Sequence, residues 1–542
     1  MLSPRLRRPA FFAVLAALLP LAGCTTDGKT VAPAGSVPGA PSGGSAGAPA
    51  VVDSQGLGTV AIQNAQDKAI SRLTNAQFIQ SASALLGDAA VVGADQLLPE
   101  QDRHGAFRNT GFAQDQPFDL IQGYDAAASS IVEHVPDWLA FHQKWGGCTD
   151  ATCVKTFIHN FSEAAFRRPT TDAEVAAFQP ILDASAAAAL SYDETVKLLV
   201  RATLQAPEFL YLFADDALSD FQLAARLSYF ITDGPPDAAL YAAAKAGSLR
   251  NAGGLDAQID RLLSQSLSRF ASAFAFDYLD LRRATTRNLT ADEATVRQLM
   301  SSAVDSMSAL VEQNRPISTI LTLDTFVTNP ATASWINGAS STDASVKPNP
   351  SYPFMGLLTH PATLMAMSNA VFGSTVSRGT FIANQMLCIP PTPPPPPGIQ
   401  QTDLSSLLPP DPTQRDEGEA RLADARCQGC HAQFEAYSFA FNKWGGDGQF
   451  KTDPRLKDDG PVKTGLGEIA FGGYADFLPK LANSSQFQRC VTDQLIRYGL
   501  QHTEYPPELV QTVLDDAAKL DPNLTFRSLI KALVRQQIFA TR

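Results

Sequence analysis

The stretch SDFQLAARLSYF, residues 219–230, shows most directly how this chain folds. Leu223, Leu227 and Phe230 recur with the i, i+4, i+7 spacing that places apolar side chains on one face of a helix. Ser219 precedes them, at the position where a hydroxyl accepts a hydrogen bond from the first free backbone amides of a helix. The stretch therefore predicts a capped helix with one buried apolar face.

The same local signals recur before this stretch. Thr74 is expected to cap a helix that Gly87 stops, and Thr171 and Glu174 have the spacing of a capping box. Long segments of alternating polar and apolar residues, which are typical of strands, are scarce. The sequence therefore predicts a mainly α fold.

The length and charge of the chain limit the classes of function. It has 542 residues, of which 45% are hydrophobic and 18% are charged, and this is enough apolar material for real cores. The 42 basic and 54 acidic residues give a net charge of −12, and no Lys/Arg-rich run occurs after residue 8, so no nucleic-acid partner is expected. The one long apolar run lies at the N-terminus, which excludes a polytopic membrane protein.

Residues 1–23 have the pattern of an export signal. Three arginines precede residue 9, and the stretch Phe11–Leu21 is almost wholly apolar but too short for a stable membrane span. It ends in Leu21-Ala22-Gly23-Cys24, which resembles the lipobox of bacterial lipoproteins. The resemblance implies cleavage after Gly23 and lipidation of Cys24. An ordinary secretory signal with a chance cysteine is the alternative.

The residues after the lipobox indicate how the protein is held at the membrane. Thr25 stands in place of the Asp that, by the same resemblance, retains lipoproteins at the inner membrane. We therefore expect an outer-membrane lipoprotein, facing the periplasm or the cell surface and bound to the membrane through its N-terminal lipid. Residues 24–65 are rich in Gly, Ser, Ala and Pro, so they are expected to form a flexible tether.

A second change of composition divides the rest of the chain. Seven of the eight residues from Pro390 to Pro397 are proline, which excludes a helix there and predicts an extended spacer. A ligand for a proline-reading module is the alternative. The expected organisation is a helical domain at 66–215, a second helical domain at 216–389, a proline-rich linker at 390–412 and a C-terminal unit at 413–542.

Seven cysteines occur: Cys24, Cys148, Cys153, Cys388, Cys427, Cys430 and Cys490. Without the lipobox cysteine, six remain in an oxidising compartment. Cys148 and Cys153 lie close together after two glycines, which predicts a local disulfide. Cys388 and Cys490 lie on either side of the remaining two cysteines, and their pairing would leave no odd thiol. Because six cysteines permit many connectivities, this pairing is a consistency argument.

The motif Cys427-Gln428-Gly429-Cys430-His431 is typical of c-type haem attachment. Two thiols at this spacing add to the two haem vinyl groups, and the next residue places an imidazole under the iron. Cys427 and Cys430 are therefore the candidate haem attachment residues, and His431 is the candidate proximal iron ligand. A Cys427–Cys430 redox disulfide, a structural zinc site and a degenerate haem-free motif are the alternatives.

The sixth ligand of the iron is open on sequence alone. No Met follows His431, although Met is a common second axial ligand. His502 is the only imidazole downstream, with a surface histidine as its alternative role. The upstream donors are Met355, His360, Met365, Met367 and Met386. An iron with no sixth protein ligand would allow peroxide or other small-ligand chemistry.

Further motifs follow one another in order along the chain. They are RLTNAQF (72–78), AFRRPT (165–170), APEFLY (206–211), LAARLSYF (223–230), GLLTHPA (356–362), VSRG (376–379), FAFN (439–442) and FGG (471–473). With the CxxCH motif, they resemble the planctomycete-type cytochrome c-like multi-domain proteins, a group of unknown function that is also common in myxobacteria. The resemblance spans most of residues 69–503. It implies a multi-helical body followed by a small cytochrome c-like helical C-terminal unit.

The chain departs from the family pattern near the haem motif. Glu435-Ala436-Tyr437-Ser438 stands where Asp-Pro-Leu-Gly is usual, so a proline that would help to hold the proximal imidazole is absent. Asn442 stands where an acidic residue is usual, and His502 stands near a usual Arg.

Together these features predict an envelope-anchored lipoprotein that carries haem c covalently. Its function would be electron transfer or haem-dependent redox chemistry with an unknown redox partner protein or substrate, and a haem-dependent oxidoreductase is a variant of this interpretation. The rival interpretation is a haem-free, disulfide-stapled envelope binding or assembly lipoprotein.

Overall fold

The computed structural model describes residues 70–100, 107–110, 118–147, 150–214, 217–251, 253–287, 291–338, 341–368, 373–393, 398–399, 402–460, 462–464 and 467–541. The predicted signal peptide, the lipidation site Cys24, the tether and Cys148 lie outside these residues. The described chain is mainly α-helical, which confirms the predicted fold class. Among these residues, no helix combines the length and the apolar character needed to cross a bilayer.

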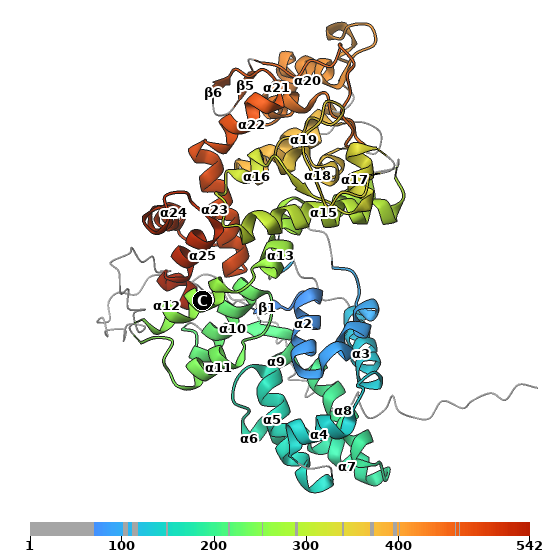
Figure 1. The fold of residues 1–542 in the computed structure, drawn as a ribbon, viewed down its shortest axis with the longest axis vertical. Coiled ribbons are helices and arrows are strands. Elements are labelled where there is room, and N and C mark those ends of the chain that lie inside the picture. The colour runs from blue at the N-terminus through green and yellow to red at the C-terminus, as the bar shows by residue number, and fades with distance from the viewer. Residues whose placement is uncertain are drawn as a thin grey trace, which may run out of the picture.

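The N-terminal part is a bundle of helices at the bottom of the molecule (Figure 1). The strands β1 (Ile70–Arg72) and β2 (Tyr211–Phe213) pair antiparallel at the two ends of this part of the sequence. Its buried apolar residues, from Phe78 to Leu210, form one cluster. The helical elements are α2 (Asn75–Leu86), η1 (Gly87–Gln96), α3 (Phe118–Glu133), α4 (Trp138–Gly146), η3 (Ala151–Cys153), α5 (Val154–Phe166), α6 (Asp172–Ala177), α7 (Gln179–Ala187), α8 (Tyr192–Gln205) and α9 (Pro207–Leu210).

The next helices form the middle of the molecule and lead upward in Figure 1. The elements are α10 (Asp220–Thr232), α11 (Ala238–Lys245), α12 (Gly254–Ser264), α13 (Ser268–Tyr278), α14 (Arg282–Arg287), α15 (Glu293–Glu312), α16 (Thr319–Thr322), β3 (Phe326–Val327), α17 (Pro330–Asn337), β4 (Ser345–Val346), η4 (Leu357–Thr359), α18 (Pro361–Ala366), α19 (Thr375–Phe381) and the π-helix η5 (Ile382–Met386). The strands β3 and β4 pair antiparallel.

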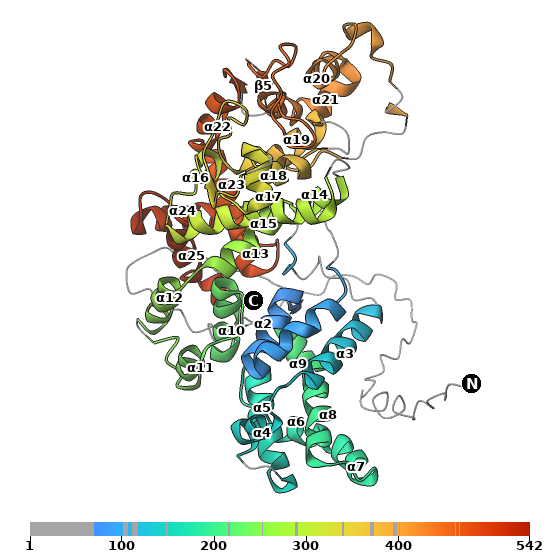
Figure 2. The ribbon, with the colours of Figure 1, turned by 45° about the vertical axis from the view of Figure 1, so that its right-hand side comes forward.

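The C-terminal elements cover the top and then return to the middle, so the C-terminus lies beside α10 in both views (Figures 1 and 2). They are η7 (Ser405–Leu407), α20 (Gln414–Ala423), α21 (Ala425–His431), η8 (Glu435–Phe441), β5 (Val462–Thr464), β6 (Gly467–Ile469), α22 (Tyr474–Ala482), α23 (Ser485–Leu500), α24 (Glu508–Leu520), α25 (Phe526–Val534) and η9 (Gln537–Ala540). The strands β5 and β6 pair antiparallel.

The predicted helix starts are confirmed. Thr74, Thr171 and Ser219 each accept a hydrogen bond from the backbone amide three residues later, and each forms a full capping box. Gly87 ends α2 with a φ of 69°, a conformation in which glycine has no steric cost. These three starts were predictable because a cap depends on residues within one helical turn.

A second buried cluster joins the middle helices to the C-terminal elements. It contains Leu223 and Leu227 of α10 together with Phe441 and Leu495. Residues after position 412 therefore pack directly against the helices before position 390. Residues 394–397 of the proline run lie outside the described chain, and the division into domains stays a prediction.

The structure describes one of the two predicted disulfides in full and one cysteine of the other. Cys388 and Cys490 are bonded, as predicted, and the bond spans 102 residues of sequence from the end of η5 to α23. Closing a loop of this length restricts the unfolded chain and stabilises the fold by about 2–4 kcal/mol. Cys153 is also disulfide-bonded, and its predicted partner Cys148 lies outside the described residues.

Candidate functional site

The CxxCH motif forms the short helix α21 at the top of the molecule (Figure 1). Asp424 ends α20 and begins α21, because its side chain accepts a hydrogen bond of 2.8 Å from the backbone amide of Arg426. Cys427, Cys430 and His431 follow at i, i+3 and i+4, a spacing that puts all three side chains on one face of the helix.

The two motif cysteines are free thiols in the structure. Cys427 is buried and Cys430 is half-buried. Within the described chain, no group of three or more His, Cys, Asp or Glu side chains converges closely enough to hold a metal ion. The thiols and the imidazole therefore share a helix face without forming a compact zinc-type site.

The imidazole of His431 is oriented by a buried carboxylate. Its Nδ1 lies 2.5 Å from Oε2 of Glu435, four residues later, and its ring lies against that of Phe434 with centroids 5.1 Å apart. An ionised carboxylate can only accept, so Nδ1 carries the proton. In the neutral imidazole, Nε2 keeps its lone pair, and no hydrogen bond to it occurs within the described residues. Because the His431 side chain is 22% exposed, its Nε2 atom is accessible as a ligand for a metal ion.

Glu435 is fully buried and is held from two other elements. Arg421 of α20 donates to it from Nε and, at 2.6 Å, from Nη2, and Thr375 of α19 donates at 2.8 Å. Burial raises the pKa of Glu435, but the hydrogen bonds from His431, Arg421 and Thr375 and the charge of Arg421 outweigh it, and the pKa is lowered. The carboxylate is therefore ionised at neutral pH.

The lowered pKa of Glu435 predicts an acid-sensitive contribution to stability. The contribution is complete above the ordinary glutamate pKa, about 4.3, and is lost as the pH falls through the lower pKa of the folded state. We expect Glu435→Gln to flatten the decline in unfolding free energy between about pH 5 and pH 3. Urea titrations at a series of pH values measure this slope, and equal slopes for the variant and the parent protein would contradict the prediction.

The segment that carries Glu435 is fixed against the body by α19. Arg378 is 2% exposed, and its guanidinium donates to the backbone oxygens of Phe441, Trp444 and Gly445 at 2.7–2.8 Å. A Cβ atom on Gly379 would lie 2.5 Å from the backbone oxygen of Phe434, so only glycine permits this close approach.

The structure does not bring His502 to His431. Gln501 caps the C-terminal end of α23, and its side chain accepts a hydrogen bond from Ser71 of β1. The strand β1 lies in the middle of the molecule, whereas α21 lies at the top (Figure 1). His502, which follows Gln501, is therefore placed beside β1 and away from the CxxCH helix.

Four of the five upstream donors are buried in the core, and Met355 is half-buried against it. Burial lowers the pKa of His360 to about 3, its Nε2 lies 3.1 Å from Ser302 Oγ, and its Nδ1 caps α18. The sulfur of Met386 accepts a hydrogen bond from the hydroxyl of Tyr278 at 3.2 Å. Met365 and Met367 are fully buried in the second cluster. These side chains have packing roles.

Glu435 is a residue of the candidate site that the sequence pattern did not single out. It was counted only as part of a departure from the family pattern. Its i+4 spacing from His431 is a local signal that could have indicated the contact. The contributions of Arg421 and Thr375 depend on how α19 and α20 pack, so no local pattern indicates them.

Three family models match separate parts of the chain. PSD5, described as a protein of unknown function (DUF1595), matches residues 153–213. PSD4, a protein of unknown function (DUF1592), matches residues 218–336, and PSCyt3, a protein of unknown function (DUF1588), matches residues 355–454. These matches are consistent with planctomycete-type cytochrome c-like multi-domain proteins of unknown function. Neither the curated proteins nor the solved structures gave a match.

Proposed function

We propose that this protein is an envelope lipoprotein whose C-terminal unit carries one covalently attached haem c and serves electron transfer. The observation that carries the proposal is the arrangement on α21. Two free thiols and an imidazole share one helix face, and the imidazole has Nδ1 bonded to Glu435 and Nε2 available. The donor set fits c-type haem, because the chemistry needs two thiols and one oriented imidazole.

Each residue of the site has a distinct task in this proposal. The thiols of Cys427 and Cys430 would hold the group covalently, and Nε2 of His431 would bind its iron. A bound haem supplies one-electron redox chemistry, with a reactivity set by the sixth position. Glu435 keeps the proton on Nδ1 and so fixes the direction of the Nε2 lone pair.

The exposure of the site is compatible with electron transfer to an unidentified redox partner. Cys430 and His431 are half-buried at the top of the molecule, where a partner protein could approach. Lipidation of Cys24 would hold the chain at the outer membrane, facing the periplasm or the cell surface. A haem-dependent oxidoreductase remains a variant, and rapid binding of cyanide or peroxide to the iron would indicate it.

The experiment that tests this function is a haem assay on the exported chain. The mature protein, with Cys24→Ser, is expressed in a periplasm that has cytochrome c maturation machinery. We expect a reduced pyridine haemochrome spectrum and a haem-stained band on a denaturing gel. The double variant Cys427→Ala/Cys430→Ala should lose the covalent signal, because neither thioether bond can form.

The matched control is Gln428→Ala, since Gln428 is exposed on the same helix and lies between the two cysteines. This variant should keep the haem signal of the parent chain. A folded and exported parent protein without covalent haem would contradict the proposal. The haem-free envelope binding protein would then be the better account.

A further inference from the structure

A cavity of about 340 Å³ lies in the middle of the molecule, away from the CxxCH helix. It opens where α2 of the N-terminal bundle faces α13 and the end of α23, so it lies on the seam between the two buried clusters. Cavities at such seams are common ligand sites, and this volume is at the small end of their range.

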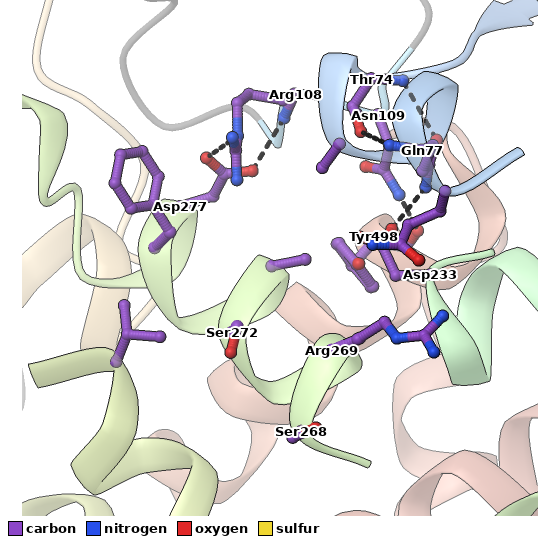
Figure 3. Close-up of a pocket in the computed structure, with 15 residues that line it drawn as sticks. Thr74, Gln77, Arg108, Asn109, Asp233, Ser268, Arg269, Ser272, Asp277 and Tyr498 are labelled. Carbon is purple, nitrogen blue, oxygen red and sulfur yellow. Dashed lines mark hydrogen bonds and ion pairs between the residues drawn. The ribbon is translucent and has the colours of Figure 1, made fainter. Parts of the chain in front are cut away.

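One side of the cavity presents buried polar atoms without protein partners. The hydroxyl of Tyr498 and Oδ1 of Asn109 are buried, and neither has a hydrogen-bond partner in the described part of the chain. Figure 3 shows both residues on the same side as Gln77 and Asp233. A buried polar atom that makes no hydrogen bond costs stability, so a bound ligand would satisfy these atoms.

Asp233 contributes a third acceptor to the same side. One of its carboxylate oxygens accepts a 2.7 Å hydrogen bond from Gln77 Nε2, and within the described residues its other oxygen has no partner. Asp233 is 5% exposed, and burial raises its pKa to about 7 although Gln77 and Arg108 act to lower it. The carboxyl therefore does not require a cation as its partner.

The charges around the cavity favour a neutral ligand. On the side opposite Asp233, Arg108 pairs with Asp277 at 2.9 Å (Figure 3). Arg108 also pairs with Glu100 at 3.2 Å. Arg269 is exposed at the rim. An anion would meet Asp233 and Asp277, and a cation would meet Arg108 and Arg269, so neither sign of charge is selected.

The remaining wall is apolar. Ala273, Phe276 and Val304 contribute it from α13 and α15. A ring with C–H groups on its faces and hydroxyls on its edge would place the C–H groups against this wall and the hydroxyls toward the polar side. The hydroxyls of such a ligand can both donate and accept hydrogen bonds. They would donate to the two acceptors, Asn109 Oδ1 and the Asp233 carboxyl, and could do either with the Tyr498 hydroxyl.

We propose that this cavity binds a small neutral polyhydroxylated ligand, a single sugar ring or a cyclic polyol, through Tyr498, Asn109 and Asp233. The site is independent of the haem proposal, because none of its residues belongs to the α20–η8 region.

Titration calorimetry on the full mature chain tests the proposal, with D-glucose and myo-inositol as the neutral probes and acetate and putrescine as the charged ones. We expect a neutral probe to bind and the charged probes not to bind. Tyr498→Phe should weaken binding by about fivefold, because it removes one hydroxyl and leaves the ring packing unchanged. Asp233→Asn should weaken it by about tenfold, because the amide is a poorer acceptor than the carboxylate.

The matched control is Tyr192→Phe. The Tyr192 hydroxyl is likewise buried without a partner in the described chain, but it lies in the N-terminal bundle and does not line the cavity. This variant should bind the probe as the parent chain does. Binding of neither neutral probe, stronger binding of a charged probe, or unchanged binding in both cavity variants would overturn the proposal.

Discussion

Arg378→Met is expected to lower the free energy of unfolding by about 4 kcal/mol. The guanidinium of Arg378 donates to three backbone oxygens and to Ser368 Oγ, all in a region where it is 2% exposed. Methionine fills a similar volume but donates no hydrogen bond, so three buried carbonyls would lose their donor, and each such loss costs about 1–3 kcal/mol before relaxation. Because the substitution also removes a buried charge, part of that loss of stability is offset.

Urea unfolding followed by tryptophan fluorescence measures the effect, since Trp444 is itself one of the residues that Arg378 binds. Arg168→Met is the matched control. Arg168 belongs to another motif, but its side chain is 36% exposed and pairs with Glu174 at the surface. Its loss should cost no more than about 1 kcal/mol. Equal losses for the two variants would contradict the role that we assign to Arg378.

The buried arginines of three sequence motifs share one structural task. Arg167 donates to the backbone oxygens of Glu208 and Phe209, at 2.7 and 3.1 Å. Arg226 donates to the backbone oxygens of residues 539 and 541 at the end of the chain. With Arg378, they tie segments that are distant in sequence to the helices that carry the motifs. The arginines of these three motifs are therefore structural, and they do not by themselves indicate an activity.

This task could not be predicted from the sequence, because it depends on distant carbonyl groups. The starts of α2, α6 and α10 could be predicted, since Thr74, Thr171 and Ser219 act within one turn of their own helices. The Cys388–Cys490 bond could be predicted only by elimination among the cysteines. At the candidate site, the spacing of Cys427, Cys430 and His431 was local and therefore evident.

The place of His502 in the fold could not be predicted from its order in the sequence. Sequence order made His502 a candidate because it is the only imidazole downstream of His431. The 16 residues of α23 separate the top of the molecule from the region of β1, and His502 lies at the β1 end. The distance between two residues in space depends on the length and direction of the helix between them, so their order in the sequence does not predict it.

Glu435 is the position where one substitution should change both stability and redox chemistry. Glu435→Ala leaves His431, Arg421 and Thr375 without their common acceptor in a fully buried place, so we expect a loss of about 3 kcal/mol in unfolding free energy. Glu435→Gln keeps the volume and one acceptor oxygen but removes the negative charge. It should cost less stability and is therefore the better variant for redox measurements.

If the chain carries haem as we propose, the charge of Glu435 would raise the basicity of the proximal imidazole and so would favour the oxidised iron. We expect Glu435→Gln to raise the ratio of reduced to oxidised iron at a fixed potential by about tenfold, which is about 59 mV for one electron. Spectroscopic potentiometry measures this ratio. Glu419→Gln is the control, because Glu419 is a surface residue of α20 and its substitution changes the net charge by the same amount.

Two outcomes separate a tuning role from a purely structural one. If Glu435 only shapes the site, both Glu435 variants lose stability and the potential of Glu435→Gln matches that of Glu419→Gln. If the carboxylate acts through Nδ1 of His431, the potential moves in Glu435→Gln alone, and the direction of the shift is toward easier reduction. The hydrogen bond between Nδ1 and Oε2 favours the second outcome, because a charge-assisted hydrogen bond couples the charge of the carboxylate to the imidazole.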